Sequence, residues 1–245
     1  MMMNNRVTTA LIIIGITFAA SAFSQGFDHS TFDGLLKRYV DRDGMVNYPG
    51  FAKSESFKEY VAAIGKADTK KFSDNEMLAF YINAYNALVI KNVIDHMPLD
   101  SPMDVDGFFK KKKFSIAGEK MTLDKLEYDH IIPLGGALIH FGVVCAAQSC
   151  PKLIRKAYTP GTVYRQLEEN ARTFLRDPSK NKLDKAANTL KLSEIFKWFS
   201  DDFEKKFGSV RAVAEKYMSD SDAAYIKKNK PSIDYLRYDW SLNSQ

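Results

Sequence analysis

The sequence lacks the motifs that build metal and nucleotide sites. Its 245 residues contain two cysteines and four histidines, and no HExxH motif, CxxC pair, GxGxxG fingerprint or phosphate loop occurs. These motifs hold ligands or phosphates at a fixed spacing, so their absence argues against such sites. His29, His96 and His130 also have no metal-ligand spacing. We therefore expect neither a metal nor a cofactor.

The sequence also has no large excess of positive or negative charge. The chain has 35 Lys and Arg residues against 30 Asp and Glu residues, and the net charge is +5. Because the basic residues are dispersed, we expect no nucleic-acid partner. The dense basic run Lys110–Lys113 is interpreted as a solvated loop. The functional alternative is that it contacts an anionic polymer of the cell envelope. The hydrophobic content of 45% is that of a globular chain.

The N-terminal segment has the pattern of a secretory signal. Arg6 precedes the apolar run Leu11–Ala20, and small residues follow up to Ser24. The apolar run is shorter than the about 20 residues that cross a bilayer comfortably. We predict that residues 1–24 are a cleaved signal peptide and that the mature protein is periplasmic or secreted. An uncleaved anchor is the alternative, and no transmembrane segment is expected after cleavage.

Residues 25–245 are predicted to form a single α+β domain. No internal repeat or low-complexity linker divides them. Ser73 and Glu76 form a capping box at the start of a helix that continues to Pro98. Apolar residues surround nearly the whole helix, so we expect it to be buried at the centre.

Shorter elements complete the predicted fold. Residues 113–122 indicate a β-hairpin that turns at Ala117 and Gly118, and residues 137–144 indicate a buried strand. The expected architecture has several helices packed around a small, mostly antiparallel sheet, which is compatible with a thiol-hydrolase-like layout.

The segment HFGVVCAAQSCPK, residues 140–152, holds His140 and both cysteines. A nucleophilic cysteine needs a lowered thiol pKa, which a histidine or a helix start supplies. The expected pair has His140 in a strand and Cys150 at the start of a helix or turn. This arrangement resembles the general layout of thiol hydrolases. In an oxidising compartment, however, Cys145 and Cys150 would form a disulfide, and neither would then be a nucleophile. The residues leave both alternatives open.

Polar residues in apolar surroundings are the other site candidates. Asn83 and Asn86 lie on one face of the central helix, with Tyr85 between them. They are expected either to hold a neighbouring loop, which is the more ordinary role, or to line a substrate pocket. Glu127 precedes the histidine segment and is a candidate for orienting His140; an exposed helix residue is the alternative.

Several stretches resemble a known family, the bacterial and plant domain of unknown function 547. They are FYINAYNALVI, MTLDKLEYDHI, IHFGVVCAAQSCPKL, AYTPGTVYRQLEENARTFL, KLSEIFKWFSDDF and YDWSLN, and the family-like core spans about residues 70–200. The resemblance implies one domain. It points to six motif positions: Asn83, Asn86, Glu127, His140, Cys145 and Cys150.

One position departs from the pattern of that family. Family members often have an arginine two residues before the histidine, where this chain has Leu138. A role for that arginine, such as anion binding, is therefore not carried over. Members also occur where disulfides are disfavoured, which lowers the expectation of a purely structural disulfide.

Two functions are compatible with these residues. The first is a secreted thiol-dependent hydrolase or acyl transferase acting on amide or peptide-like bonds. Cys150 or Cys145 would attack, His140 would act as base and acid, Glu127 would orient it, and the Asn83–Asn86 face would hold substrate or the oxyanion. The second is a non-catalytic cell-envelope binding module with an asparagine-lined pocket and structural cysteines. The expected partner is a peptide-like or small-molecule substrate, or an envelope protein.

Overall fold

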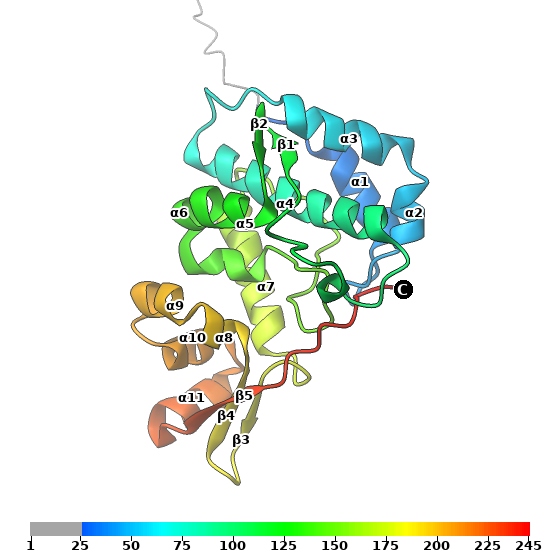
Figure 1. Cartoon of the computed structure of the whole chain (residues 1–245). Coiled ribbons are helices and arrows are strands. Elements are labelled where there is room, and N and C mark those ends of the chain that lie inside the picture. The colour runs from blue at the N-terminus through cyan, green and yellow to red at the C-terminus, as the bar shows by residue number, and fades with distance from the viewer. Residues whose placement is uncertain (1–25) are drawn as a thin grey trace, which may run out of the picture.

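The helix predicted from Ser73 lies at the centre of the structure as α4, Asp74–His96 (Figure 1). The computed structural model describes residues 26–245, so the predicted signal peptide lies outside the described residues. The side chain of Ser73 accepts the Glu76 N–H, and the Glu76 carboxylate accepts the Ser73 N–H, which confirms the capping box. By length and hydropathy α4 would suit a membrane span, but 83% of its most apolar window is buried inside the protein.

Three N-terminal helices pack beside α4. They are α1 (Ser30–Tyr39), α2 (Tyr48–Ala52) and α3 (Glu55–Lys66). Each turns aromatic and aliphatic residues inward, for example Phe32, Phe51 and Ile64, which are fully buried. Burial of such faces, rather than helix propensity alone, stabilises helices of this length.

The predicted hairpin is confirmed. Strands β1 (Phe114–Ile116) and β2 (Glu119–Met121) pair in antiparallel fashion, with η1 (Pro102–Asp104) before them. Ala117 and Gly118 form the turn with φ values of 49° and 83°. Positive φ at both central residues matches the twist of a tight hairpin.

The predicted strand over residues 137–144 is wrong. After α5 (Leu123–Leu126), η2 (Glu127–Ile131) and α6 (Ile132–Gly135), the chain enters a 3₁₀ helix, η3, Gly136–Phe141. Gly136 has a φ of 57°, which redirects the chain from α6 into η3. Its backbone hydrogen bonds are local, as in Gly142 N–H to Ile139 O, so no partner strand is needed. A short apolar run does not distinguish a strand from a buried helix.

A second group of elements forms the middle and lower part of the molecule in Figure 1, with α7 in the middle. The helices are α7 (Val163–Leu175), α8 (Ile195–Trp198), α9 (Ser200–Phe207), α10 (Val210–Tyr217) and α11 (Asp220–Asn229). The strands are β3 (Lys182–Asp184), β4 (Thr189–Ser193) and β5 (Ser232–Leu236). Strands β3 and β4 are antiparallel, whereas β4 and β5 are parallel. The α+β class is thus confirmed, with two small sheets in place of one.

The C-terminal segment joins the two parts of the molecule. After β5 it runs back toward the N-terminal helices, as the red trace in Figure 1 shows. Bridges link Ala147 with Leu242 and Val46 with Ser244. Backbone hydrogen bonds from the Ser149 N–H to Asp239 O and from the Asn243 N–H to Ala146 O place residues 239–243 against the loop that carries both cysteines.

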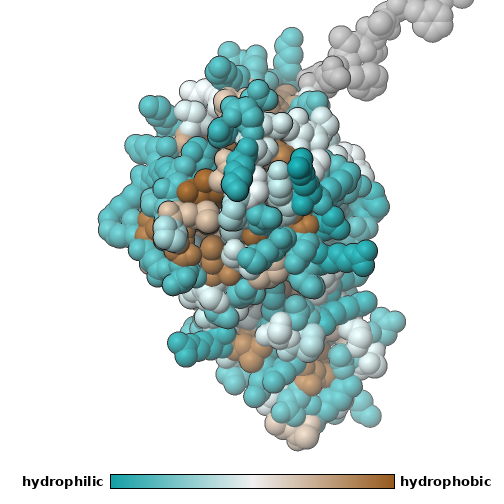
Figure 2. Space-filling model, turned by 90° about the vertical axis from the view of Figure 1, so that its right-hand side faces the viewer, coloured by the Kyte–Doolittle hydropathy of each residue, from teal (hydrophilic) through white to brown (hydrophobic). Residues whose placement is uncertain are grey.

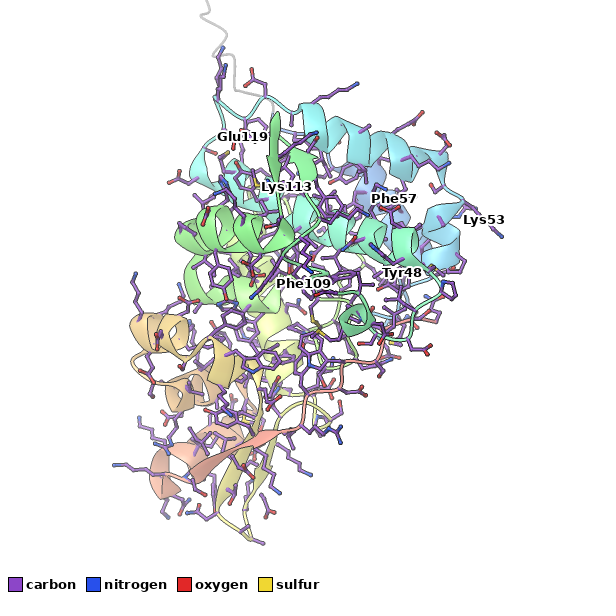
Figure 3. All side chains as sticks on the ribbon, in the orientation of Figure 1. Tyr48, Lys53, Phe57, Phe109, Lys113 and Glu119 are labelled. Carbon is purple, nitrogen blue, oxygen red and sulfur yellow. A yellow bond between two sulfur atoms is a disulfide. The ribbon has the colours of Figure 1, made fainter. Side chains whose placement is uncertain are left out.

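The face shown in Figure 2 is mainly hydrophilic, with apolar side chains gathered at mid-height on its left side and a few others dispersed over it. Such a surface is ordinary for a globular domain. Figure 3 shows Phe109 below α4 in the middle of the molecule. There it borders the pocket described next.

Candidate functional site

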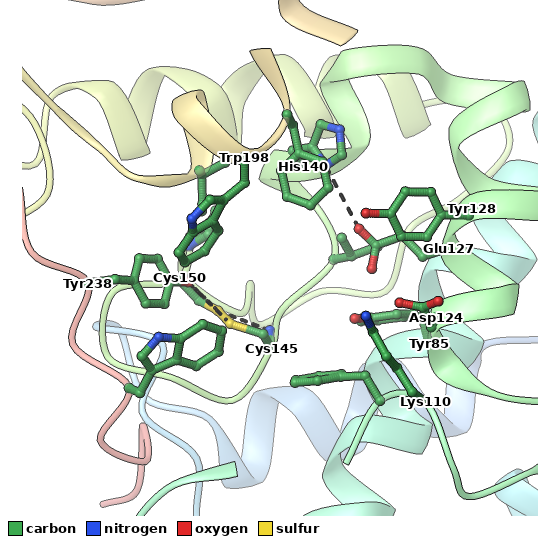
Figure 4. A pocket seen from close by; sticks show the side chains of 16 residues that line it. Tyr85, Lys110, Asp124, Glu127, Tyr128, His140, Cys145, Cys150, Trp198 and Tyr238 are labelled. Atoms are coloured by element: carbon green, nitrogen blue, oxygen red, sulfur yellow. Dashed lines mark hydrogen bonds and ion pairs between the residues drawn. A yellow bond between two sulfur atoms is a disulfide. The ribbon is translucent and has the colours of Figure 1, made fainter. Parts of the chain in front are cut away.

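A pocket of about 170 Å³ lies where segments far apart in the sequence meet (Figure 4). Its aromatic lining comes from Phe109, Tyr128, Trp198, Phe199, Tyr238 and Trp240. Its polar lining comes from Tyr85, Lys110, Asp124, Glu127 and His140. The disulfide of Cys145 and Cys150 completes the wall. A mainly apolar cavity with a few converging polar groups is the usual form of a small-molecule site.

One side of the pocket is a cluster of aromatic rings. Trp198 from α8 and Trp240 from the C-terminal segment stack with centroids 5.7 Å apart, and Tyr238 lies 4.7 Å from each. Trp198 is 44% exposed, which is unusual for so large an apolar side chain. These are the two tryptophans of the whole chain.

Glu127 is the buried acid of the pocket. Its side chain is 12% exposed, and burial raises its pKa to about 7. A hydrogen bond from Tyr85 works in the opposite direction, while the charges of Asp124 and Asp202 raise the pKa further. Both protonation states of Glu127 are therefore populated near neutral pH, which is a frequent property of functional carboxyl groups.

His140 is oriented by a carboxylate other than the predicted one. Its Nε2 lies 2.8 Å from Oδ2 of Asp202 in α9, whereas its Nδ1 is 3.9 Å from Oε1 of Glu127. Burial lowers the pKa of His140 to about 4 against the opposing effect of Asp202, so the ring is neutral. A carboxylate only accepts, so Nε2 carries the proton. Nδ1 is left as an acceptor with no hydrogen-bond partner among the described residues.

Both cysteines are bonded to each other. The Cα atoms of Cys145 and Cys150 are 6.3 Å apart. Cys150 lies in a turn in which its N–H donates to Ala147 O, so of the helix or turn start expected there the structure has the turn. The sequence left open a free catalytic thiol or a disulfide, and the structure has the disulfide. Neither sulfur is a nucleophile in this form.

Asn83 and Asn86 of α4 hold loops and do not line this pocket. Asn83 donates to Tyr158 O and accepts the Tyr158 N–H, at 2.8 and 2.9 Å. Asn86 makes the same pair of bonds with Gly142 O and the Val144 N–H. Their amides are used by the backbone, so the ordinary role is the one observed.

Part of the site does not follow from the residue patterns above. It comprises Asp202, Trp198, Tyr238 and Trp240, which lie in the family-like stretches KLSEIFKWFSDDF and YDWSLN. Those stretches contain all four residues and were the signal available. Of the predicted residues, the pocket brings together Glu127, His140, Tyr85 and both cysteines, whereas Asn83 and Asn86 bind loop backbone instead.

Comparison with known families supports the resemblance seen in the sequence. Residues 69–175 match the family described as protein of unknown function, DUF547. The chain resembles the DUF547 family. The matched residues carry Glu127, His140 and the disulfide, whereas α8, α9 and the C-terminal segment lie beyond them. No curated protein and no solved structure matched the chain.

Proposed function

We propose that this protein is a non-catalytic binding module of the cell envelope whose pocket holds a small organic ligand. The observation that carries the proposal is the pocket itself, whose lining combines the stacked rings of Trp198 and Trp240 with the polar side chains of Glu127 and His140. Aromatic faces supply contact area, and a few polar atoms fix the orientation of a ligand.

The state of the cysteines favours binding over thiol chemistry. A cysteine nucleophile must be a thiolate, and the disulfide removes both thiols. His140 is engaged with Asp202 in place of a sulfur. The pocket differs from the asparagine-lined one first expected, because its polar groups are Glu127, His140 and Asp124.

Ligand binding can be followed through the intrinsic fluorescence of the protein. Both tryptophans of the chain line the pocket, so a bound ligand should change the fluorescence emission of both. A library of small metabolites screened by tryptophan fluorescence and thermal shift should yield a saturable ligand. A screen without any ligand that affects both signals would contradict the proposal.

A matched pair of variants localises the binding. Trp198→Ala should abolish or strongly weaken the binding of any ligand found, and folding should be preserved because Trp198 is partly exposed. Tyr164→Ala is the control, since Tyr164 is 40% exposed on α7 and does not line the pocket. Equal affinities in the two variants would place the ligand elsewhere.

We also propose an extracytoplasmic location, with a mature chain that begins near Gln25. The predicted signal pattern and the disulfide support it, because disulfides persist in oxidising compartments. N-terminal sequencing of the protein recovered from a cell envelope fraction tests this. An intact Met1 would contradict cleavage.

A second candidate is the thiol-dependent hydrolase or transferase, active after reduction. Cys150 Sγ receives the Cys145 N–H at 3.0 Å and the Tyr238 hydroxyl at 3.2 Å. Two such donors would stabilise a Cys150 thiolate at the pocket wall. Reduction would require an external dithiol, which becomes a disulfide as the Cys145–Cys150 bond opens to two thiols.

Alkylation separates the two candidates. The native protein should not label with iodoacetamide, and after a dithiol is added Cys150 should label below the ordinary thiol pKa of about 8.5 if it serves as a nucleophile. Tyr238→Phe should then slow labelling at mildly acidic pH. Labelling only above that pKa, equal in both proteins, would reject the thiol enzyme and leave the binding module.

A further inference from the structure

We propose that the pocket ligand is an organic ammonium ion, namely a protonated amine attached to an apolar or aromatic body. This inference rests on the proposed binding function of the pocket and names the chemistry of its ligand. It follows from three properties of the lining: the hydrogen-bonding character of its polar atoms, the aromatic faces and the charges.

The inner polar atoms of the pocket are hydrogen-bond acceptors. Neutral His140 uses its proton toward Asp202, so Nδ1 offers only a lone pair. Oε1 of Glu127 lies 3.9 Å from that buried nitrogen, and the Glu127 side chain, which is 12% exposed, is the acceptor open to a ligand. The carboxylate of Asp124 is a further acceptor in the same lining. A group that carries several N–H donors and no lone pair, as an ammonium does, matches this set.

The aromatic wall favours the same charge. The faces of tryptophan and tyrosine rings attract cations, and the attraction grows where water is excluded. Trp198, Tyr238 and Trp240 form one contiguous cluster. Figure 4 shows Trp198 and Tyr238 across the pocket from Glu127. A ligand with an apolar body would therefore lie against the rings while its ammonium points toward the carboxylate.

The charges of the lining leave a place for a cation. Asp124 and Glu127 lie on consecutive turns of α5 and η2, and the Asp202 carboxylate approaches from α9 behind His140. Lys110 is the one lysine in the lining, is exposed, and makes no ion pair within 4.0 Å in residues 26–245. Solvent screens such an exposed charge, so Lys110 offsets the buried carboxylate only in part.

The binding of a cation should depend on pH through Glu127. The groups facing this carboxyl are Tyr85, Asp124, Tyr128, His140 and Asp202, with Lys110 at the exposed edge. A cation prefers the ionised carboxylate, whose pKa in the free protein is about 7. Affinity should therefore be constant above this pH as long as the ligand keeps its own ammonium proton, and should fall about tenfold per pH unit well below it, because one proton competes with the ligand.

Three probes that share a phenyl ring separate charge from donor capacity. Phenethylammonium carries both the charge and the N–H donors, benzyltrimethylammonium lacks the N–H donors, and 2-phenylethanol lacks the charge. We expect affinity to fall in that order when tryptophan fluorescence of the full mature chain is titrated at pH 8. Glu127→Gln should weaken phenethylammonium by at least about tenfold, the loss of one hydrogen bond to a charged group, and leave 2-phenylethanol unchanged.

The controls distinguish the inference from the proposed function. Glu119→Gln removes an exposed glutamate on β2 and should leave all three affinities unchanged. If 2-phenylethanol binds as tightly as phenethylammonium and Glu127→Gln changes neither, the pocket binds ligands but does not select cations. If none of the probes binds and the metabolite screen also fails, both the inference and the binding function are overturned.

Discussion

Nε2 of His140 lies 2.8 Å from Oδ2 of Asp202, which is 62 residues later in the sequence. The bond connects η3, in the part of the chain that matches the DUF547 family, with α9, which lies beyond it. The His140 ring also stacks on Phe199, with centroids 3.9 Å apart. Because the ring is buried, this one carboxylate decides which nitrogen bears the proton and which faces Glu127.

Removing that carboxylate should destabilise the fold. Asp202→Ala leaves the buried Nε2 without its acceptor, and we expect the free energy of unfolding to fall by about 1–3 kcal/mol. Partial exposure of Asp202 favours the lower end of this range. Urea unfolding followed by far-UV circular dichroism measures the change. Asp201→Ala, an exposed neighbour on the same helix, is the control, and equal values for the two variants would contradict the role of Asp202.

The pH dependence of stability should reveal Glu127. Its pKa is about 7 in the folded state against an ordinary value of 4.5 in the unfolded chain. Between these two pH values the folded state therefore binds more protons than the unfolded state. Its contribution is therefore favourable below pH 4.5 and is lost as the pH rises through 7. His140, with a folded pKa of about 4, acts in the opposite direction: its contribution is complete above pH 6.5 and is lost toward pH 4.

Glu127→Gln isolates the first of these effects. Relative to the unchanged protein, the variant should gain stability as the pH rises from 4.5 to 7, by up to about 3 kcal/mol for a shift of this size. Urea titrations at half-unit pH intervals measure the difference. A difference that is independent of pH would show that the Glu127 carboxyl is not desolvated.

The asparagine bonds of α4 should matter to folding and not to ligand binding. Asn83→Leu leaves both the N–H and the carbonyl of Tyr158 without partners, at about 1–3 kcal/mol for each buried group. Asn75→Leu, at an exposed position of the same helix, should have little effect. Chemical denaturation compares the two, and pocket affinity should be unchanged in both. If the folded Asn83→Leu variant lost affinity for the pocket ligand, Asn83 would have to contribute to ligand binding.

Loss of the disulfide should cost a moderate part of the stability. The loop between Cys145 and Cys150 is short, and closing a loop of this length stabilises a fold by about 2 kcal/mol in the chain-entropy model. The Cys145→Ser, Cys150→Ser double variant should show this decrease in denaturant unfolding without reductant. A native protein with two free thiols by mass spectrometry would contradict the bonded form.

Local features of the fold followed directly from neighbouring residues. The capping box at Ser73 and Glu76, the turn at Ala117 and Gly118, and the burial of α4 all depend on side chains within a few positions of each other. The strand expected at His140 failed, because the apolar run there carries no periodicity that separates a strand from a buried 3₁₀ helix. Its conformation was decided by packing against α7 and α9.

The sequence by itself determined the α+β class, the central helix and the candidates Glu127, His140, Cys145 and Cys150, because these depend on local pattern and residue type. Only the tertiary structure decided that Asp202 holds His140, that the cysteines are joined, and that two distant tryptophans line one pocket with Glu127. Those features depend on contacts between residues far apart in the chain and on the exclusion of water from buried groups. The spacing of residues along the sequence specifies neither the distant contacts nor the burial.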